Sequence, residues 1–400
     1  MTMDDVTTRE QSEAEHLRFE LVREKRAQAV ALLRQHGIDC WLTFAREGSD
    51  LMLPYVLGSD EIVGVSALLI FADGRNTAIV ADYDVGQVAG LYDDVISYSL
   101  DWREPLQHLL SERRPNEIAL NFSATDHGID GLTHGLYLAL TQALLPIGYN
   151  ERVRSAEPIA TAIRSIKTPS ELERMRRAAT ITERIFDDLT GMLRPGLTER
   201  DVYEIVQERM TTYEVTPAWE QSWCPTVATS RTESGHNPPG MTKIEPGDAV
   251  RVDFGVKYEA YCSDMQRTWY LRRPGESGPP ANLVHAYETV RDGIRLAAEL
   301  IKPGVRGYDV DEPVRRLVAE RGYTFTHALG HQLGRLTHDG GMLLGPQNAR
   351  YGDRSGGVIE AGMVFTLEPC IDAIGLEDDV VVTNDGCEFL IPTPDAMTVI

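Results

Sequence analysis

The sequence predicts two domains, an α/β domain over residues 1–165 and an α+β domain with internal pseudo-twofold symmetry over residues 166–400. Three observations support this fold class. The 400 residues are too many for one ordinary hydrophobic core. Strand and helix signals alternate in the first part, which is typical of an α/β domain. In the second part a short pattern occurs twice, and each copy precedes a predicted hairpin with two carboxylates.

The first domain carries signals for one helix and several strands. The spacing of apolar residues predicts an amphipathic helix over residues 21–36. Runs rich in β-branched and aromatic residues predict strands over residues 40–44, 65–72, 76–81 and 117–122. Neither G-x-x-x-x-G-K-[ST] nor G-x-G-x-x-G occurs in this domain, so no phosphate-binding loop is predicted.

The boundary between the domains lies in the segment IRSIKTPSELERMRRAA. Thr168 suits an N-cap, Pro169 suits the first helical position, and Glu171 stands where a capping box needs an acid. A long helix should therefore begin here and end near Met192.

The second domain contains a weak internal repeat. The segment MLRPGLTERDVYEIVQERM resembles LIKPGVRGYDVDEPVRRLVAERG, so that Pro195-Gly196 matches Pro303-Gly304. In each copy a helix ends at Pro-Gly, a second helix follows, and a hairpin comes later. We expect a duplicated helix–helix–hairpin unit whose two hairpins meet in one curved sheet, with the helices outside.

Each predicted hairpin carries one pair of carboxylates. Residues that face each other across an antiparallel hairpin have numbers with a constant sum. Asp253 and Asp264 are symmetric about the midpoint of residues 258–259, and Glu368 and Glu377 about the midpoint of residues 372–373. Directly opposed like charges destabilise a sheet, so four carboxylates held this way require a cation. With a histidine added, they would form a binuclear metal site.

Histidines cluster in the segment THALGHQLGRLTHDGG, which contains His327, His331 and His338. A fourth, His236, lies upstream in SRTESGHNPPG. A single histidine is more often structural than a ligand. Three within a dozen residues, flanked by glycine, favour a functional cluster.

The composition narrows the class of partner and the cellular location. The net charge of −22, from 39 basic and 61 acidic residues, argues against nucleic acid or an anionic membrane as a partner. No apolar run reaches the roughly 18–20 residues that span a bilayer. The first residues, MTMDDVTTREQSEAEH, are too polar and acidic for a signal peptide. Five cysteines without C-x-x-C spacing predict free thiols in a reducing cytoplasm.

The ordered set of motifs is more specific than any one of them. An aspartate, a second aspartate eleven residues later, Gly-His, Thr-x-Glu-Pro and a final Glu-Asp together resemble the pita-bread metallopeptidases. These include methionine aminopeptidase, Xaa-Pro aminopeptidase and prolidase. The α/β domain and the I-x-x-I-K-T/S-x-x-E-L junction resemble the branch of prolidase, Xaa-Pro aminopeptidase and creatinase. The resemblance implies five metal ligands, all present here: Asp253, Asp264, His331, Glu368 and Glu377.

The resemblance also implies a mechanism. Carboxylates with one imidazole suit two divalent ions, with Mn²⁺ preferred and Co²⁺, Zn²⁺ or Fe²⁺ as alternatives. A hydroxide shared by two ions would attack the peptide carbonyl, and Glu368 would carry a proton to the leaving nitrogen. His338 would stabilise the tetrahedral intermediate, His236 would line the substrate pocket, and His327 would lie near the leaving residue. Each of these three histidines could instead support the ligands from behind.

An arginine is the candidate for substrate recognition. Arg354 stands fourteen residues before Glu368, where prolidases have an arginine that binds the free carboxylate of a dipeptide. An ordinary surface arginine is the alternative, and Arg350 is a weaker substitute for the role. The chain departs from the family pattern at Gly375, where many relatives have arginine, and after Pro369, where they read Gly-x-Tyr. These departures affect substrate choice more than metal binding.

The sequence therefore predicts a cytoplasmic, homodimeric Xaa-Pro dipeptidase that hydrolyses dipeptides with carboxyl-terminal proline. The nearest alternative is an Xaa-Pro aminopeptidase acting on longer peptides. Another small-molecule hydrolase or lyase on the same fold is a second alternative. A catalytically silent binding protein is the third, and the complete ligand set argues against it.

Overall fold

The computed structural model describes residues 3–232 and 237–400, with side chains from residue 16 onward. The chain forms two compact units, Met1–Arg164 and Ser165–Ile400, and each has its own hydrophobic core. The predicted fold class, an α/β domain followed by an α+β domain, is confirmed.

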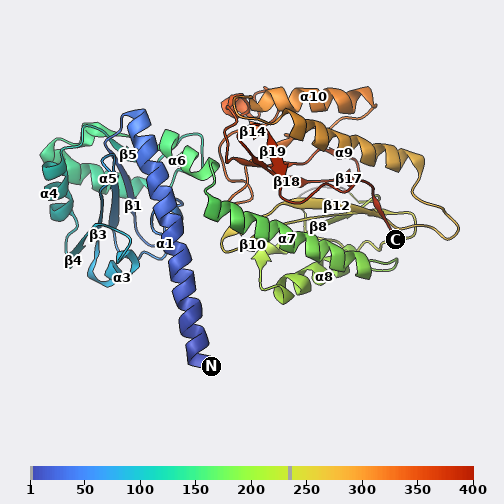
Figure 1. Cartoon of the computed structure of the whole chain (residues 1–400), viewed down its shortest axis with the longest axis horizontal. Coiled ribbons are helices and arrows are strands. Elements are labelled where there is room, and N and C mark those ends of the chain that lie inside the picture. Colours follow the sequence, from blue (N-terminus) through green and yellow to red (C-terminus); the bar gives the residue numbers. More distant parts are fainter. Residues whose placement is uncertain (1–2, 233–236) are drawn as a thin grey trace. The chain divides into compact units, whose positions relative to one another are not determined.

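Unit 1 is built around a six-stranded mixed sheet in the order β4-β3-β2-β1-β5-β6 (Figure 1). Residues of α1, α3 and α6 pack on one side of the sheet, and residues of α4 and α5 pack on the other. The strands are β1 (Cys40–Ala45), β2 (Ser66–Phe71), β3 (Asn76–Ala81), β4 (Asp94–Tyr98), β5 (Ile118–Leu120) and β6 (Val153–Ser155). The helices are α1 (Met3–His36), α2 (Leu53–Val56), α3 (Val85–Val88), α4 (Arg103–Arg113), α5 (His134–Leu144) and α6 (Glu157–Ser165).

The four predicted strands of unit 1 are all present, but two further strands were not predicted. β4 is an edge strand whose side chains are partly or fully exposed, and β6 has only three residues, so neither shows a clear apolar pattern. The predicted helix over residues 21–36 begins much earlier, at Met3. Its added part is rich in glutamate and arginine, which favour helix without forming an apolar stripe.

Unit 2 consists of two helix–helix–hairpin halves, as the repeat predicted. The first half contains α7 (Pro169–Met192) and α8 (Glu199–Thr212), and the second contains α9 (Ala281–Leu300) and α10 (Gly307–Glu320). The predicted bounds of α7 are confirmed, and Thr168 and Glu171 form the predicted capping box. Figure 1 shows strands between the two helix pairs.

The repeat extends to individual backbone contacts. Gly196 donates its N–H to Ile244 O at 2.8 Å, and Gly304 donates to Ile359 O at 2.9 Å. Both glycines have positive φ, 95° and 91°, which a residue with a Cβ adopts at a cost. The same turn therefore follows the first helix of each half.

The strands of unit 2 form several small sheets that the two hairpins connect. The main strands are β8 (Thr226–Thr229), β9 (Ala249–Phe254), β12 (Met265–Tyr270) and β20 (Thr398–Val399), then β15 (Val364–Leu367), β18 (Asp378–Val382) and β19 (Cys387–Phe389). Shorter strands are β7 (Thr216–Pro217), β10 (Val256–Tyr258), β11 (Tyr261–Cys262), β13 (Gly330–His331), β14 (Leu343–Leu344), β16 (Cys370–Ile371) and β17 (Ile374–Gly375). Gln266 and Glu377 exchange two backbone hydrogen bonds of 3.2 Å, which join the hairpins as predicted.

Candidate metal centre

The first carboxylate hairpin has a register that differs from the predicted one. Asp253 on β9 lies opposite Gln266 on β12, not opposite Asp264. The turn is centred on Glu259 and Ala260, whose positive φ values of 44° and 69° give the backbone twist that favours two-residue hairpins. The centre is thus one residue later than predicted. Asp264 lies two residues from Gln266 and remains on the face of Asp253, but diagonally.

The second carboxylate hairpin has the predicted register. Leu367 pairs with Asp378 before the site, and Cys370 pairs with Gly375 after it. The residue numbers have the same sum on both sides, so Glu368 and Glu377 lie opposite each other between these pairs. The prediction for this hairpin is confirmed.

Residues from both halves converge at one buried point. The Nε2 atom of His331 lies 3.6 Å from Oδ2 of Asp264 and 3.6 Å from Oε1 of Glu368. Possible ligand atoms of Asp264, His331 and Glu377 all lie within 4.8 Å of one another. Asp253 Oδ1 is buried and has no hydrogen-bond partner among the described residues. Carboxylate oxygens, an imidazole and an orphaned buried oxygen fit divalent metal ions.

Burial disfavours the charged form of each carboxylate and of the histidine in this cluster. It raises the pKa of Asp253 to about 6 and that of Glu368 to about 8, the latter with help from the Asp253 charge. Burial and neighbouring carboxylates raise the pKa values of Asp264 and Glu377 well above their usual range. The pKa of His331 falls to about 3, first because of burial and then because of His338. Such shifts are typical of several carboxylates buried together, and a bound cation would favour their charged forms.

Two residues that the sequence analysis missed hold the carboxylates. Gln266 donates its Nε2 hydrogen to Oε2 of Glu377 at 3.0 Å. Asp379 accepts the backbone N–H of Asp264 at 3.2 Å. Both would have been recognised with the right register, because Gln266 faces Asp253 and Asp379 follows Glu377 at the spacing of one strand face. Gln266 and Asp379 thus orient the candidate ligands through hydrogen bonds without binding the metal themselves.

Other side chains lie close to Gly375, the position where the family resemblance implies an arginine in many relatives. A Cβ at Gly375 would lie 2.0 Å from Oε1 of Gln266 and 2.7 Å from Cδ of Arg251. Arg251 comes from β9, shares the strand face of Asp253, and donates its Nη1 hydrogen to Sγ of Cys370. Its positive charge lowers the pKa of Asp253 against the effect of burial. An arginine therefore stands close to this centre, but it comes from the other hairpin.

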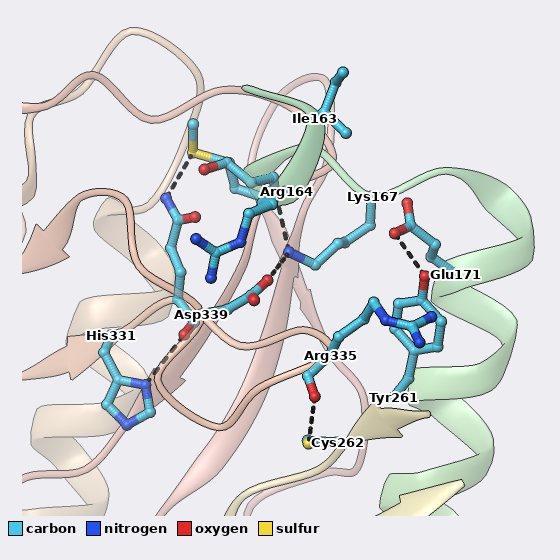
Figure 2. Close-up of polar contacts among 12 residues, drawn as sticks. Ile163, Arg164, Lys167, Glu171, Tyr261, Cys262, His331, Arg335 and Asp339 are labelled. Atoms are coloured by element: carbon cyan, nitrogen blue, oxygen red, sulfur yellow. Dashed lines mark hydrogen bonds and ion pairs between the residues drawn. The ribbon is translucent and has the colours of Figure 1, made fainter. Parts of the chain in front are cut away.

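The candidate catalytic histidines differ in how the structure places them. The ring of His338 meets the ring of His331 edge-on, with centroids 4.4 Å apart. His327 bonds through Nε2 to the carbonyl oxygen of Glu368 at 2.9 Å, so it contacts the ligand strand. Nδ1 of His331 bonds to the Gln332 carbonyl at 3.3 Å (Figure 2), which leaves Nε2 for a metal. His236 lies outside the described residues.

The two candidate substrate arginines lie on a glycine-rich segment. Arg354 is exposed, stands in a short 3₁₀ turn (Gly352–Gly356), and donates its Nε hydrogen to Gly341 O at 2.8 Å. Its charge contributes to the lowered pKa of His331. Arg350 is exposed and stacks on the ring of Tyr351, 5.3 Å from its centroid.

Comparison with known proteins agrees with this geometry. Residues 173–384, more than half of the chain, match the sequence pattern of metallopeptidase family M24. The chain belongs to this family. M24 enzymes are metal-dependent peptidases, so the chain is a metallopeptidase whose carboxylate–histidine cluster is its candidate metal site. The described residues contain no helix that is both long and apolar enough to cross a membrane.

Curated sequences that resemble the chain include uncharacterised peptidases. The chain is 33% identical over 239 residues to an uncharacterised peptidase of Staphylococcus aureus. That match covers 57% of this chain and 63% of the relative, so it spans less than two thirds of the relative's length.

Solved structures resemble the chain over nearly its whole length. An X-Pro aminopeptidase from Thermotoga maritima has a TM-score of 0.74 at 24% identity, covering 92% of this chain and 100% of the other. An Xaa-Pro dipeptidase from Bacillus anthracis has a TM-score of 0.72 at 26% identity, covering 95% and 100%. A prolidase from Pyrococcus horikoshii has a TM-score of 0.69 at 22% identity, covering 93% and 99%.

Proposed function

We propose that this metallopeptidase is an Xaa-Pro dipeptidase, which hydrolyses dipeptides with proline at the carboxyl end. The metal ligands would be Asp253, Asp264, His331, Glu368 and Glu377, with Mn²⁺ as the preferred ion. Resemblance to a bacterial Xaa-Pro dipeptidase and to a prolidase supports the substrate class.

One observation carries the dipeptide specificity. Arg354 is tied to the protein through Nε alone, and its two Nη groups have no hydrogen-bond partner among the described residues. A guanidinium held in this way can offer its remaining N–H groups to a carboxylate as a fork. The Arg354 charge helps to lower the pKa of His331, so the guanidinium lies within electrostatic reach of this candidate ligand.

The roles of the protein groups follow from their places. Two bound divalent ions would polarise the peptide carbonyl and activate water. Glu368 lies beside His331 and would hold and pass on the proton that the leaving proline nitrogen needs. Proline gives a tertiary amide without N–H, so recognition must depend on ring shape and on the carboxylate. His338, packed against His331, would donate to the carbonyl oxygen as it gains charge.

The decisive experiment uses protein stripped of metal with a chelator. Hydrolysis of Ala-Pro and of an Xaa-Pro tripeptide is measured before and after Mn²⁺ is added. Cleavage of the dipeptide alone, only with metal, is the expected result. Cleavage of the tripeptide but not the dipeptide would overturn the proposal. No cleavage of either, with two ions bound, would leave a metal site whose substrate is not a prolyl peptide.

A matched pair of variants tests Arg354. Arg354→Met should raise KM for Ala-Pro about 10- to 100-fold, the value of a lost charge-assisted hydrogen bond, with a smaller change in kcat. Arg350→Met should change KM much less, because this arginine stacks on Tyr351 and acts on His327 only through its charge. The opposite pattern would transfer the role to Arg350.

The competing function is an Xaa-Pro aminopeptidase. The similarity to the Thermotoga maritima enzyme favours it as much as the other similarities favour a dipeptidase. A carboxylate clamp has no use in the middle of a peptide, so an unchanged KM in Arg354→Met with longer peptides would support this alternative.

We also propose a homodimer in the cytoplasm, and Co²⁺, Zn²⁺ or Fe²⁺ as possible substitutes for Mn²⁺. All five cysteines are free thiols, which suits a reducing compartment. Light scattering of the purified protein would show the oligomeric state, and a monomer would contradict the proposal.

A further inference from the structure

A buried ion pair joins the start of unit 2 to the loop behind the metal centre. Lys167 lies just before α7, and its Nζ is 3.2 Å from Oδ2 of Asp339, which follows His338 in sequence. Both side chains are 1% exposed. Figure 2 shows Lys167 and Asp339 pointing toward each other, with His331 on the other side of Asp339.

The surrounding backbone is shaped to admit this pair. A Cβ at Gly334 would lie 2.1 Å from Oδ2 of Asp339 and 2.9 Å from Cε of Lys167. Lys167 is also held by its backbone, since its N–H donates to Gly362 O at 2.8 Å, at the start of the second carboxylate hairpin. The lysine is therefore fixed at both ends, and its position leaves Asp339 little freedom.

Asp339 is connected to both histidines, so its fixed position also restricts theirs. Its N–H donates to the Gln332 carbonyl at 3.0 Å, and the same oxygen accepts from Nδ1 of His331 at 3.3 Å. His338 precedes Asp339 directly and packs its ring against His331. One carbonyl thus orients the candidate metal ligand and anchors the residue next to the candidate oxyanion donor.

Stability alone is a weak reason for such a pair. A buried ion pair often contributes no more to folding than apolar side chains of the same size would. What it adds is a fixed geometry, because each charge must meet its partner. We propose that Lys167 and Asp339 are positioning residues, which set His331 and His338 for metal binding and catalysis. The part that concerns His338 rests on the proposed function.

The test separates positioning from folding. Lys167→Met and Asp339→Leu each remove one charge of the buried pair, and both should lower the melting temperature. The double variant removes both charges and should recover the melting temperature of the wild type. Its kcat on Ala-Pro should nevertheless stay about 10- to 100-fold low, as for other residues that orient a metal ligand. Wild-type kcat in the double variant would overturn the proposal.

Asp339→Asn provides a second variant of nearly unchanged shape. It retains the backbone bond to Gln332 and should fold, yet it loses the charge that meets Lys167. An intermediate kcat is expected, and wild-type kcat here would also count against positioning. The exposed pair of Arg316 and Glu312 supplies the control, because R316M/E312L should change nothing.

Metal binding can be measured without a substrate, so it tests the positioning of His331 independently of the proposed function. Binding of Co²⁺ to the stripped protein is followed by visible absorption, which reports imidazole ligation. The double variant should bind Co²⁺ about 10- to 100-fold more weakly, or with an altered spectrum. This holds even if Ala-Pro is not the substrate. Wild-type affinity and spectrum in the double variant would overturn the positioning of His331.

Discussion

The two hairpins that carry the carboxylates differ in how they place them. In the second hairpin, Glu368 faces Glu377 directly. In the first, Asp253 faces the neutral Gln266, and Asp264 lies diagonally. A duplicated unit has therefore kept its backbone plan while only one copy opposes like charges. The first hairpin avoids direct opposition of its two carboxylates, although the Asp253 charge still raises the pKa of Asp264.

The charges around Asp253 and Glu368 also differ. Arg251 lies on the strand face of Asp253 and lowers its pKa against burial, to about 6 in all. The main influences on Glu368 both raise its pKa, to about 8. Asp253 therefore has a positive neighbour that offsets part of the effect of burial, whereas the main influences on Asp264, Glu368 and Glu377 all raise their pKa values.

The largest predicted effect concerns the protein without metal. The pKa values of Asp253 and Glu368, about 6 and about 8, exceed the values near 4 of an unfolded chain. The folded state then binds more protons, so their contribution to stability is complete below about pH 4. It is lost as pH rises through about 6 for Asp253 and about 8 for Glu368. The melting temperature in chelator should fall between pH 5 and pH 8.

Variants that replace one carboxylate with a neutral amide compare Glu368 with Asp253 directly. At pH 8 in chelator, Glu368→Gln should melt about 5 °C or more above the wild type, and Asp253→Asn should gain less. Added Mn²⁺ should restore the wild type at pH 8 and leave Glu368→Gln nearly unchanged. Thermal denaturation followed by circular dichroism measures both. An equal gain in melting temperature in the two variants would contradict the proposed difference between Asp253 and Glu368.

The second predicted effect compares one glycine in each hairpin. A Cβ at Gly255 would lie 1.7 Å from the backbone oxygen of Ser263, and at Gly375 the nearest atom is a side-chain oxygen of Gln266. A backbone atom cannot move without breaking strand pairing, so Gly255→Ala should destabilise by about 3 kcal/mol or more. Gly375→Ala should cost only about 1–2 kcal/mol, because Gln266 can rotate.

Activity should separate the two glycine variants as well. When Gln266 rotates it gives up its bond to Glu377, so Gly375→Ala should also lose about tenfold in kcat. Gly386→Ala is the control, since nothing lies within 4 Å of a Cβ there. Urea denaturation gives the stabilities. An equal loss in the free energy of unfolding for Gly255→Ala and Gly375→Ala would show that the first hairpin accommodates a Cβ as readily as the second.

Local chemistry explains which features could be predicted from sequence. Thr168, Pro169 and Glu171 act on their immediate neighbours, so both the start of α7 and its cap were predictable. The register of the first hairpin was not, because Glu259 and Ala260 occupy positions of positive φ that favour glycine or asparagine. A shift of one residue in the turn then changed every cross-strand partner.

Contacts between segments that are far apart in the sequence could not be predicted, because they leave no local sequence pattern. Lys167 and Asp339 are 172 residues apart, and nothing near either residue indicates the other. Gln266 is an unremarkable glutamine until the register places it opposite Asp253. The residues that hold the candidate ligands therefore came from the structure. The four carboxylates came from their spacing in the sequence, and the full ligand set with His331 came from the family resemblance.

The smallest predicted effect compares the N-caps of the second helices in the two halves. Thr198 caps α8 and accepts the N–H of Asp201, whereas Arg306 at the start of α10 makes no side-chain cap bond. The backbone is nearly the same, with φ −92° at both caps and ψ 164° and 151°. Thr198→Ala should therefore cost about 1 kcal/mol, and Arg306→Thr should gain up to about that amount, because Asp309 already stands at the third helical position. Melting temperatures of the two variants should move in opposite directions, with no change in kcat. If Arg306→Thr gives no gain, the second half does not need the cap, because packing rather than capping then fixes the start of α10.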